Sequence, residues 1–469
     1  MKKIAIIGGG VAGATTALTL GEIGADVTLF EQEPSLISGP PFCHLHAGGN
    51  LYREISDTQC VALLRQSIAF LRRYPFCVDY RPTVIATPVT DKADPTALLP
   101  RLQLLVKEYK ALIAQDAANA VLGDPETYYR TYDKETLLKL REQEPLATPH
   151  ADDEWMIPVA RSIDLEKMKF PLMMVQEYGL NLFRLAAGVS LMLKELPTVT
   201  LQLQSKVTAI SPKERGWEIT YKKEGTSHQA HFDYLVNAAG FRTGTIDDMI
   251  GVEATRMVEF KAAYVSQWQE GKRHLFPEII FHGERGTPQG MGQFTPYPGG
   301  HFQLHGMTEA ITLYPNGLVA STPLSAQPKL DDAFIEKIEQ QWQWSEVDTR
   351  TQRAIAHIAQ FMPPFKSAKT ASKPLFGAQQ IPGEDPTLRV AEVAFPATHY
   401  ARCEIVKVSS ALDMAEAIVN KLQELDLLNS VHTYKSQPLE EADIAKAAKA
   451  IAQMRDYPAS LAGLNVPRS

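Results

Sequence analysis

Residues 3–31 read KIAIIGGGVAGATTALTLGEIGADVTLFE, and this stretch decides the fold. An apolar run that starts at Ile4 predicts a buried parallel strand, and the leucines that follow at helical spacing predict a helix. Between them lies the motif Gly8-x-Gly10-x-x-Gly13, and a second predicted strand ends at Glu31. The order of strand, glycine turn, helix, strand and acid is typical of a dinucleotide-binding βαβ unit.

Each residue type in this motif has a physical role in holding a dinucleotide. Gly8 permits the tight turn, Gly10 lets a pyrophosphate approach the backbone, and Gly13 lets the helix pack close to the sheet. The helix start around Ala12 offers N–H groups and a positive dipole end to the phosphates. Glu31 is placed to accept hydrogen bonds from ribose hydroxyls, and its charge disfavours the 2′-phosphate of NADP.

The same stretch could be interpreted as a signal peptide, because Lys2 and Lys3 precede an uncharged run that reaches Gly21. Signal peptides, however, are not rich in Gly and Thr and do not lead directly into a strand that ends in an acid. We therefore expect no cleaved leader and a cytoplasmic protein.

Length and composition exclude several classes of protein. A chain of 469 residues predicts two closely packed domains, and 45% hydrophobic with 22% charged residues is ordinary for a globular protein. The net charge of −7 predicts no nucleic-acid partner. The four cysteines form no CxxC pair, so we expect neither a metal site nor disulfides, and a reducing compartment fits. No apolar run predicts a membrane span, which leaves peripheral membrane contact open.

A second glycine-containing segment, residues 43–56, reads CHLHAGGNLYREIS. Glycine pairs such as Gly48 and Gly49 permit a flat ligand to approach the backbone, with His46 and Asn50 beside it. A plain surface loop would have the same composition, so the residues alone leave both interpretations open.

The remaining chain alternates predicted helices and strands. Residues 57–73 and a long stretch from Leu172 to Leu196 predict helices, and Glu224-Gly225 predicts a hairpin turn. Residues 232–240, FDYLVNAAG, predict a strand whose small residues let a ligand lie across the sheet edge. Alternating residues from Met257 to about Pro323 predict an antiparallel sheet. A last strand is predicted over Leu388–Val393, followed by helices over Leu412–Leu425 and Glu440–Met454.

These landmarks, in this order, resemble the D-amino-acid-oxidase-like flavoproteins, which include glycine oxidase, sarcosine oxidase and dehydrogenase, dimethylglycine dehydrogenase, glycerol-3-phosphate dehydrogenase and 2-hydroxyglutarate dehydrogenase. The landmarks are the glycine motif with Glu31, HAGGNLYRE at 46–54, the Glu144-Pro145 turn, Val207, and Asn237-Ala238-Ala239-Gly240. The resemblance covers residues 1–425 and implies FAD as cofactor. It places Val207 at the adenine and Ala238, Ala239 and Gly240 beside the FAD.

The resemblance also implies an α/β fold in which a Rossmann-like FAD-binding domain is interleaved with an antiparallel-sheet substrate domain. The FAD-binding domain is expected at 1–85, 151–256 and 381–430. The substrate domain is expected as a helical part at 86–150 and a sheet at 257–380, with a C-terminal helical tail at 431–469.

Two segments bear on the flavin. Residues 395–417, FPATHYARCEIVKVSSALDMAEA, contain no glycine where the family has a glycine-rich segment, and Ser409 and Ser410 are expected to cap the following helix. His46 begins a segment that resembles one in which dimethylglycine and sarcosine dehydrogenases link a histidine covalently to the flavin. Both a covalent and a non-covalent contact stay open for His46.

The candidate catalytic residues follow from the chemistry that a flavin needs around it. A substrate carboxylate is best held by a guanidinium, which makes Arg53 and Arg402 candidates. His399 and Tyr400 could move a proton or polarise the substrate, and His305 comes from the predicted substrate sheet.

Three functions are consistent with this sequence. The first is FAD-dependent oxidation of a small amino acid or secondary amine at its CH–N bond. The second is dehydrogenation of a hydroxy acid at CH–OH, with electrons passed to a quinone. The third is a flavin-binding protein without turnover.

Overall fold

The glycine-turn stretch forms the first two strands and the first helix in the computed structural model of the chain. These are β1 (Lys3–Ile7), α1 (Val11–Glu22) and β2 (Asp26–Phe30), in the predicted order. The structure describes residues 2–38, 53, 55–428, 433–434 and 438–466. Among these, no helix is both long and apolar enough to span a membrane.

The smaller of the two main sheets has six strands in the order β19-β20-β12-β1-β2-β8. Beside β1 and β2 it contains β8 (Val199–Gln202), β12 (Tyr234–Asn237), β19 (Val393–Ala397) and β20 (Tyr400–Cys403). Ile7 of β1 pairs with Phe30 on one side and Asn237 on the other, so the parallel strands end at one edge. That edge carries the glycine turn, as expected for a Rossmann-like sheet.

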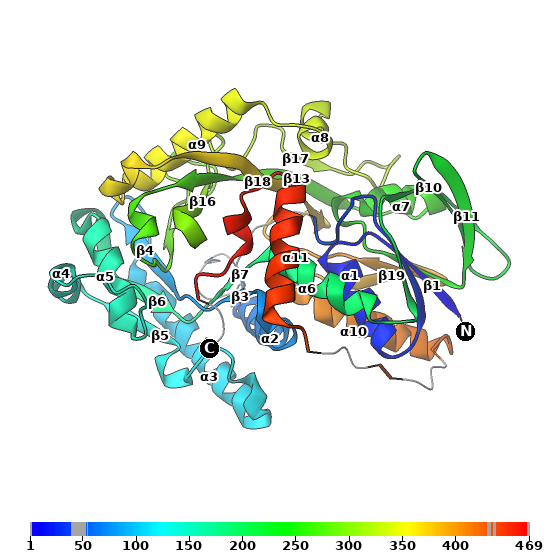
Figure 1. The fold of residues 1–469 in the computed structure, drawn as a ribbon, viewed down its shortest axis with the longest axis horizontal. Helices are drawn as coiled ribbons and strands as arrows, with labels where there is room; N and C mark the ends of the chain where they lie inside the picture. Colours follow the sequence, from blue (N-terminus) through cyan, green and yellow to red (C-terminus); the bar gives the residue numbers. More distant parts are fainter. Residues whose placement is uncertain (1, 39–52, 54, 429–432, 435–437, 467–469) are drawn as a thin grey trace.

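The larger sheet has nine strands and runs from the upper part of Figure 1 down its left side, with α8 (Asp332–Glu339) and α9 (Trp344–Ala359) along the outer side of its upper part. Its strands are β4 (Thr83–Pro88), β5 (Tyr129–Tyr132), β6 (Met168–Val175), β13 (Arg256–Gln267), β14 (Glu278–Phe281), β15 (Gly292–Tyr297), β16 (His301–Gly306), β17 (Leu318–Ala320) and β18 (Lys369–Pro382). Most pairs are antiparallel, which confirms the second sheet predicted after Met257.

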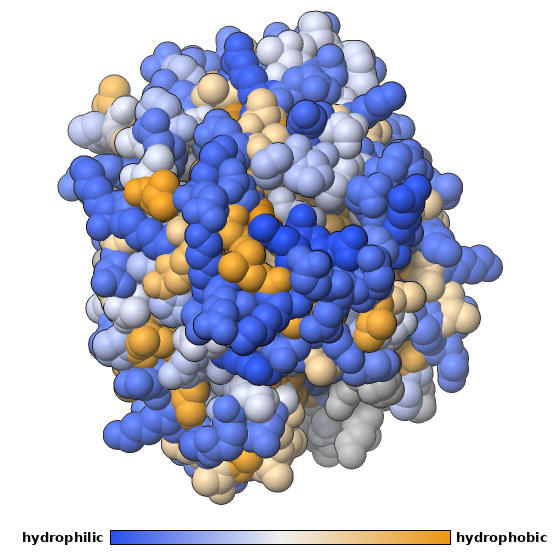
Figure 2. Space-filling view, turned by 90° about the vertical axis from the view of Figure 1, so that its left-hand side faces the viewer, coloured by the Kyte–Doolittle hydropathy of each residue, from blue (hydrophilic) through white to orange (hydrophobic). Residues whose placement is uncertain are grey.

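The other elements surround these two sheets. A three-stranded sheet contains β9 (Ser205–Pro212), β10 (Trp217–Lys223) and β11 (Thr226–Phe232), and β3 (Val78–Asp79) pairs with β7 (Gly179–Leu180). The remaining helices are α2 (Asp57–Arg73), α3 (Leu99–Gln115), α4 (Lys134–Arg141), α5 (Asp152–Ser162), α6 (Leu182–Lys194), α7 (Thr243–Ile250), α10 (Ala411–Glu424) and α11 (Glu441–Met454). On the face shown in Figure 2, hydrophobic residues lie as separate spots among hydrophilic ones.

Two predicted elements are wrong. The helix expected from Leu172 begins only at Leu182, because residues 168–175 form β6 and pair with β4 and β5. β6 therefore joins the larger sheet, although it falls within the range 151–256 expected for the FAD-binding domain. The last strand was expected over Leu388–Val393, but the structure has two short strands further on, β19 and β20, which pair with each other. β20 also pairs in parallel with β12.

Candidate functional site

The glycine turn has the geometry that each glycine was expected to provide. Gly8 has a φ of +103°, and a Cβ there would lie 2.4 Å from the carbonyl oxygen of Ala238. A Cβ on Gly13 would lie 1.9 Å from the carbonyl oxygen of Gly8, so the helix contacts the turn directly. A Cβ on Gly10 would meet no atom within 4 Å. Gly10 thus faces open space at the start of α1.

Glu31 directly follows β2 beside this turn and is buried. Its carboxylate accepts the backbone N–H of Gly9 at 2.7 Å and that of Glu33 at 2.8 Å. Burial raises the pKa of Glu31, and these two backbone hydrogen bonds oppose the rise. The acid is therefore held rigidly against the turn at the position where the sequence predicts a ribose contact.

A cavity of about 730 Å³ opens at this edge of the six-stranded sheet. Its walls come from the glycine turn, the β2–α2 connection, β9, the residues after β12, β18, the segment after β20, and the residues after α11. Of the predicted cofactor residues, those that line it are Gly8, Gly10, Ala12, Glu31, Val207, Ala238, Ala239 and Gly240. Gly13 packs behind the turn, and His46, Gly48, Gly49 and Asn50 lie outside the described residues.

Two predicted catalytic residues lie in a buried network instead of in the cavity wall. Arg402 donates to Asp247 at 3.1 Å and to Glu404 at 2.7 Å, and Arg256 lies 2.7 Å from the same oxygen of Asp247. The Tyr400 hydroxyl donates to Asp247 and accepts from the side chain of Asn237 at 2.7 Å. These contacts join β12, β20, α7 and β13 behind the cavity.

The three other predicted catalytic residues are also not among the cavity-lining residues. His399 precedes β20, at the end of the parallel strands opposite the glycine turn. His305 is buried in β16, with its Nε2 2.8 Å from the side-chain amide of Gln303. Arg53 makes a bidentate ion pair with Asp91, at 2.9 Å for each contact, and holds the pKa of that carboxyl at about 2. Catalytic roles for these residues stay predictions.

The structure places in the cavity wall a lysine that the sequence did not single out. Lys407 follows β20 and lines the cavity. Burial, and then the charge of Arg389, holds the pKa of Lys407 well below its usual range. The signal in the sequence was a lone charge in the apolar run Ile405-Val406-Lys407-Val408.

A second lysine is connected to the same segment through the larger sheet. Lys261 of β13 lies 2.6 Å from Glu259 and donates to the side chain of Gln379 at 3.1 Å. Gln379 lines the cavity and donates to the backbone carbonyl of Val406 at 3.1 Å. Arg285 also pairs with Glu259. Mixed charges therefore lie where the larger sheet meets the end of β20.

The serine caps expected before α10 form differently. Ser410 occupies the N-cap position, but its hydroxyl donates to the carbonyl of Lys407 at 2.7 Å and accepts no helix N–H. Ser409 and Ser410 are both buried within a short 3₁₀ turn. The hydroxyl of Ser410 thus fixes the backbone at Lys407.

We predict that Lys261 makes stability depend on pH above neutrality. Burial lowers the pKa of Lys261 to about 8 from the ordinary value of 10.5. Between these values the unfolded chain binds the proton and the folded chain does not, so stability is lost as pH falls from 10.5 to 8. We expect the free energy of unfolding of the wild type, relative to Lys261→Met, to rise with pH in this window by up to about 1.4 kcal/mol per pH unit. Denaturant titrations at a series of pH values measure this difference, and a flat difference would contradict it.

The sheet edge, glycine turn and acid define a nucleotide-binding α/β protein. A family model described as "FAD dependent oxidoreductase" (DAO) matches residues 3–372. The chain belongs to this family and is an FAD-dependent oxidoreductase. The cavity suits the cofactor, because Gly10 leaves the backbone open there and Glu31 borders it.

Solved structures share the fold at low sequence identity. Glycerol-3-phosphate dehydrogenase from Bacillus halodurans, complexed with FAD, has a TM-score of 0.55 at 13% identity, over 98% of this chain and 73% of that chain. Glycine oxidase from Geobacillus kaustophilus has a TM-score of 0.53 at 12% identity, over 90% of this chain and 95% of that chain. L-Proline dehydrogenase from P. horikoshii has a TM-score of 0.57 at 14% identity, over 92% of this chain and 95% of that chain.

One curated relative matches in sequence over a short segment. The methylenetetrahydrofolate–tRNA-(uracil-5-)-methyltransferase of Lawsonia intracellularis is 43% identical over 69 residues. That segment is 14% of this chain and 16% of the relative, so the match does not extend over most of either protein.

Proposed function

We propose that this protein oxidises a small amino acid or secondary amine at its CH–N bond, with FAD accepting the hydride. The observation that carries the proposal is Lys407, an amine in the cavity wall just after β20, whose pKa is held well below its usual range by burial and by the charge of Arg389. A substrate carboxylate bound beside this amine would favour its protonated form, and the two would then make a charge-assisted pair. Glycine oxidase and L-proline dehydrogenase, whose names refer to amino acids, share the fold and support this choice.

Under this proposal, the chain's own residues orient the substrate and control its charge. Lys407 binds the carboxylate, and Ser410 and Gln379 fix the backbone on either side of it through the carbonyls of Lys407 and Val406. Lys261 contacts Gln379 from behind the cavity wall and so helps to hold this side chain in place. Arg53 and Arg402 stay rival carboxylate ligands, although each already pairs with acids.

Anaerobic reduction of the bound flavin tests the proposal. The purified protein is mixed with glycine, sarcosine, proline and other small amino acids, and in parallel with small hydroxy acids and glycerol 3-phosphate. We expect bleaching of the oxidised flavin band by one of the amino acids or secondary amines. Bleaching by a hydroxy acid alone would support the CH–OH alternative, and dithionite-reducible FAD that no compound reduces would support a binding protein without turnover.

A further inference from the structure

The C-terminal residues 441–466, here called the strap, lie beyond the residues that the family model matches and run across both main parts of the fold. In Figure 1, α11 lies over α6, between the larger sheet and the α2 region. Ile444, Ala448 and Ala452 of α11 are buried in the same core as α1 and α6. Because these side chains are apolar and fully covered, the strap is a fixed part of the fold.

The strap continues past α11 to the larger sheet. The Tyr457 hydroxyl donates to the carbonyl of Pro374 on β18 at 2.7 Å. The side chain of Asn181 donates to the carbonyls of Leu461 and Gly463, and the backbone N–H of Val466 donates to Asp79 at 2.8 Å. The strap is therefore anchored before Arg455 by the buried face of α11 and after it by the contacts of Tyr457 and the residues that follow.

Between these anchors, Arg455 contacts the wall of the FAD cavity. Its Nε and Nη2 donate to the Ser35 hydroxyl at 3.0 and 2.7 Å, Nη2 donates to the Leu36 carbonyl at 2.6 Å, and Nη1 donates to the Ile37 carbonyl at 3.1 Å. Met454, Arg455 and Tyr457 themselves line the cavity. The planar fork of an arginine holds such neighbouring acceptors in one fixed arrangement.

The loop that Arg455 holds is connected to the glycine turn. The backbone N–H of Ile37 donates to the Gly9 carbonyl at 2.8 Å, and the Gly9 N–H donates to Glu31. A displacement of residues 35–37 would therefore reach the turn and the acid together. Burial lowers the pKa of Arg455 only to about 10, so the guanidinium keeps its positive charge at neutral pH. That charge faces the cavity that binds the anionic cofactor.

We propose that the strap is part of the FAD site, with Arg455 as a positioning residue that fixes residues 35–37 and slows release of the cofactor. The four donated hydrogen bonds use four of the five N–H groups of the guanidinium. Its net charge is stabilised by the nearby carboxylates of Glu31 and Glu33, which belong to the same connection after β2.

FAD release from Arg455→Ala and Arg455→Lys tests this inference. The holoenzyme is diluted, and dissociated FAD is followed by the recovery of its fluorescence. We expect release to be at least about tenfold faster in Arg455→Ala, since several charge-assisted bonds are lost, and intermediate in Arg455→Lys. Excess FAD should restore full flavin content in both variants.

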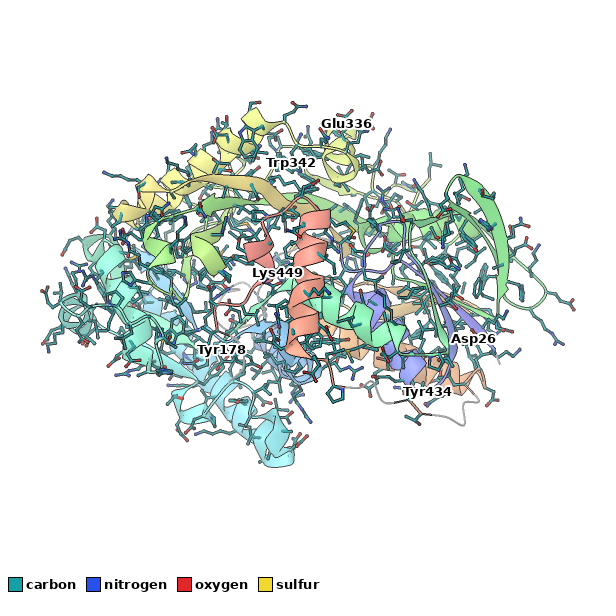
Figure 3. The ribbon with its side chains drawn as sticks, in the orientation of Figure 1. Asp26, Tyr178, Glu336, Trp342, Tyr434 and Lys449 are labelled. Atoms are coloured by element: carbon teal, nitrogen blue, oxygen red, sulfur yellow. The ribbon has the colours of Figure 1, made fainter. Side chains whose placement is uncertain are left out.

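Matched variants separate a cofactor role from general loosening of the chain. Lys449 is exposed on α11, the helix that precedes Arg455, where Figure 3 labels its side chain, and Lys449→Ala should release FAD at the wild-type rate. Tyr457→Phe removes one anchor while keeping Arg455, and it should speed release to a smaller extent. If Arg455→Ala fails to fold, the rate of FAD release from Arg455→Lys tests the inference in its place. Wild-type FAD affinity and release in a folded Arg455 variant would overturn the inference.

Discussion

Replacing Gly10 by valine should abolish FAD binding while leaving the protein folded. Gly10 is the N-cap residue of α1 and has φ −62° and ψ −179°, a conformation that any residue adopts, and a Cβ there would meet no atom within 4 Å. The added isopropyl group therefore fits the protein and occupies the open space that the pyrophosphate needs. We expect the dissociation constant for FAD to rise by more than about a thousandfold.

Flavin content after purification, FAD titration by fluorescence quenching and circular dichroism of the apoprotein measure this result together. Gly10→Ala is the graded control and should bind FAD weakly. Gly13→Val is the contrasting variant, because its Cβ would lie 1.9 Å from the Gly8 carbonyl and the chain itself should lose stability. A yellow Gly10→Val protein with wild-type affinity would contradict the assigned place of the cofactor.

The glycine turn and its flanking elements were predictable because their physical constraints are local. An apolar strand, a helix start and an acid all fall within 29 residues. Each of the three glycines is required there for a separate steric reason. The helix over 57–73 and the hairpin turn at Glu224-Gly225 were confirmed for the same reason. Where the environment that decides a structure is near in sequence, pattern alone is sufficient.

The errors came from contacts that are distant in sequence. Residues 172–175 have an apolar composition that suits a helix, and pairing with β4 and β5 makes them a strand. The ion pair between Arg402 and Asp247, which lies 155 residues away, was likewise not visible in the sequence, and the role of Arg402 as a carboxylate ligand stays a prediction. Arg455 could not be connected to the cavity from sequence, because Ser35 lies 420 residues before it.

Replacing Lys407 by methionine should weaken substrate binding more than any substitution at the arginines proposed from sequence. Methionine keeps most of the side-chain volume and removes the charge. Losing one partner of a desolvated ion pair costs about 2–4 kcal/mol, so we expect the substrate dissociation constant in anaerobic flavin reduction to rise by about 30- to 1,000-fold. FAD affinity should change little, since the other cavity-lining residues stay in place.

The chain offers a control for charge at the cavity itself. Lys206 also lines the cavity, on β9 beside Val207, and is exposed. Lys206→Met should leave flavin reduction by the substrate unchanged, because β9 is expected at the adenine end of the cofactor. Arg53→Ala and Arg402→Ala, measured in the same assay, test the competing ligands. If either arginine variant loses substrate affinity while Lys407→Met retains it, the carboxylate lies with that arginine and Lys407 has another role.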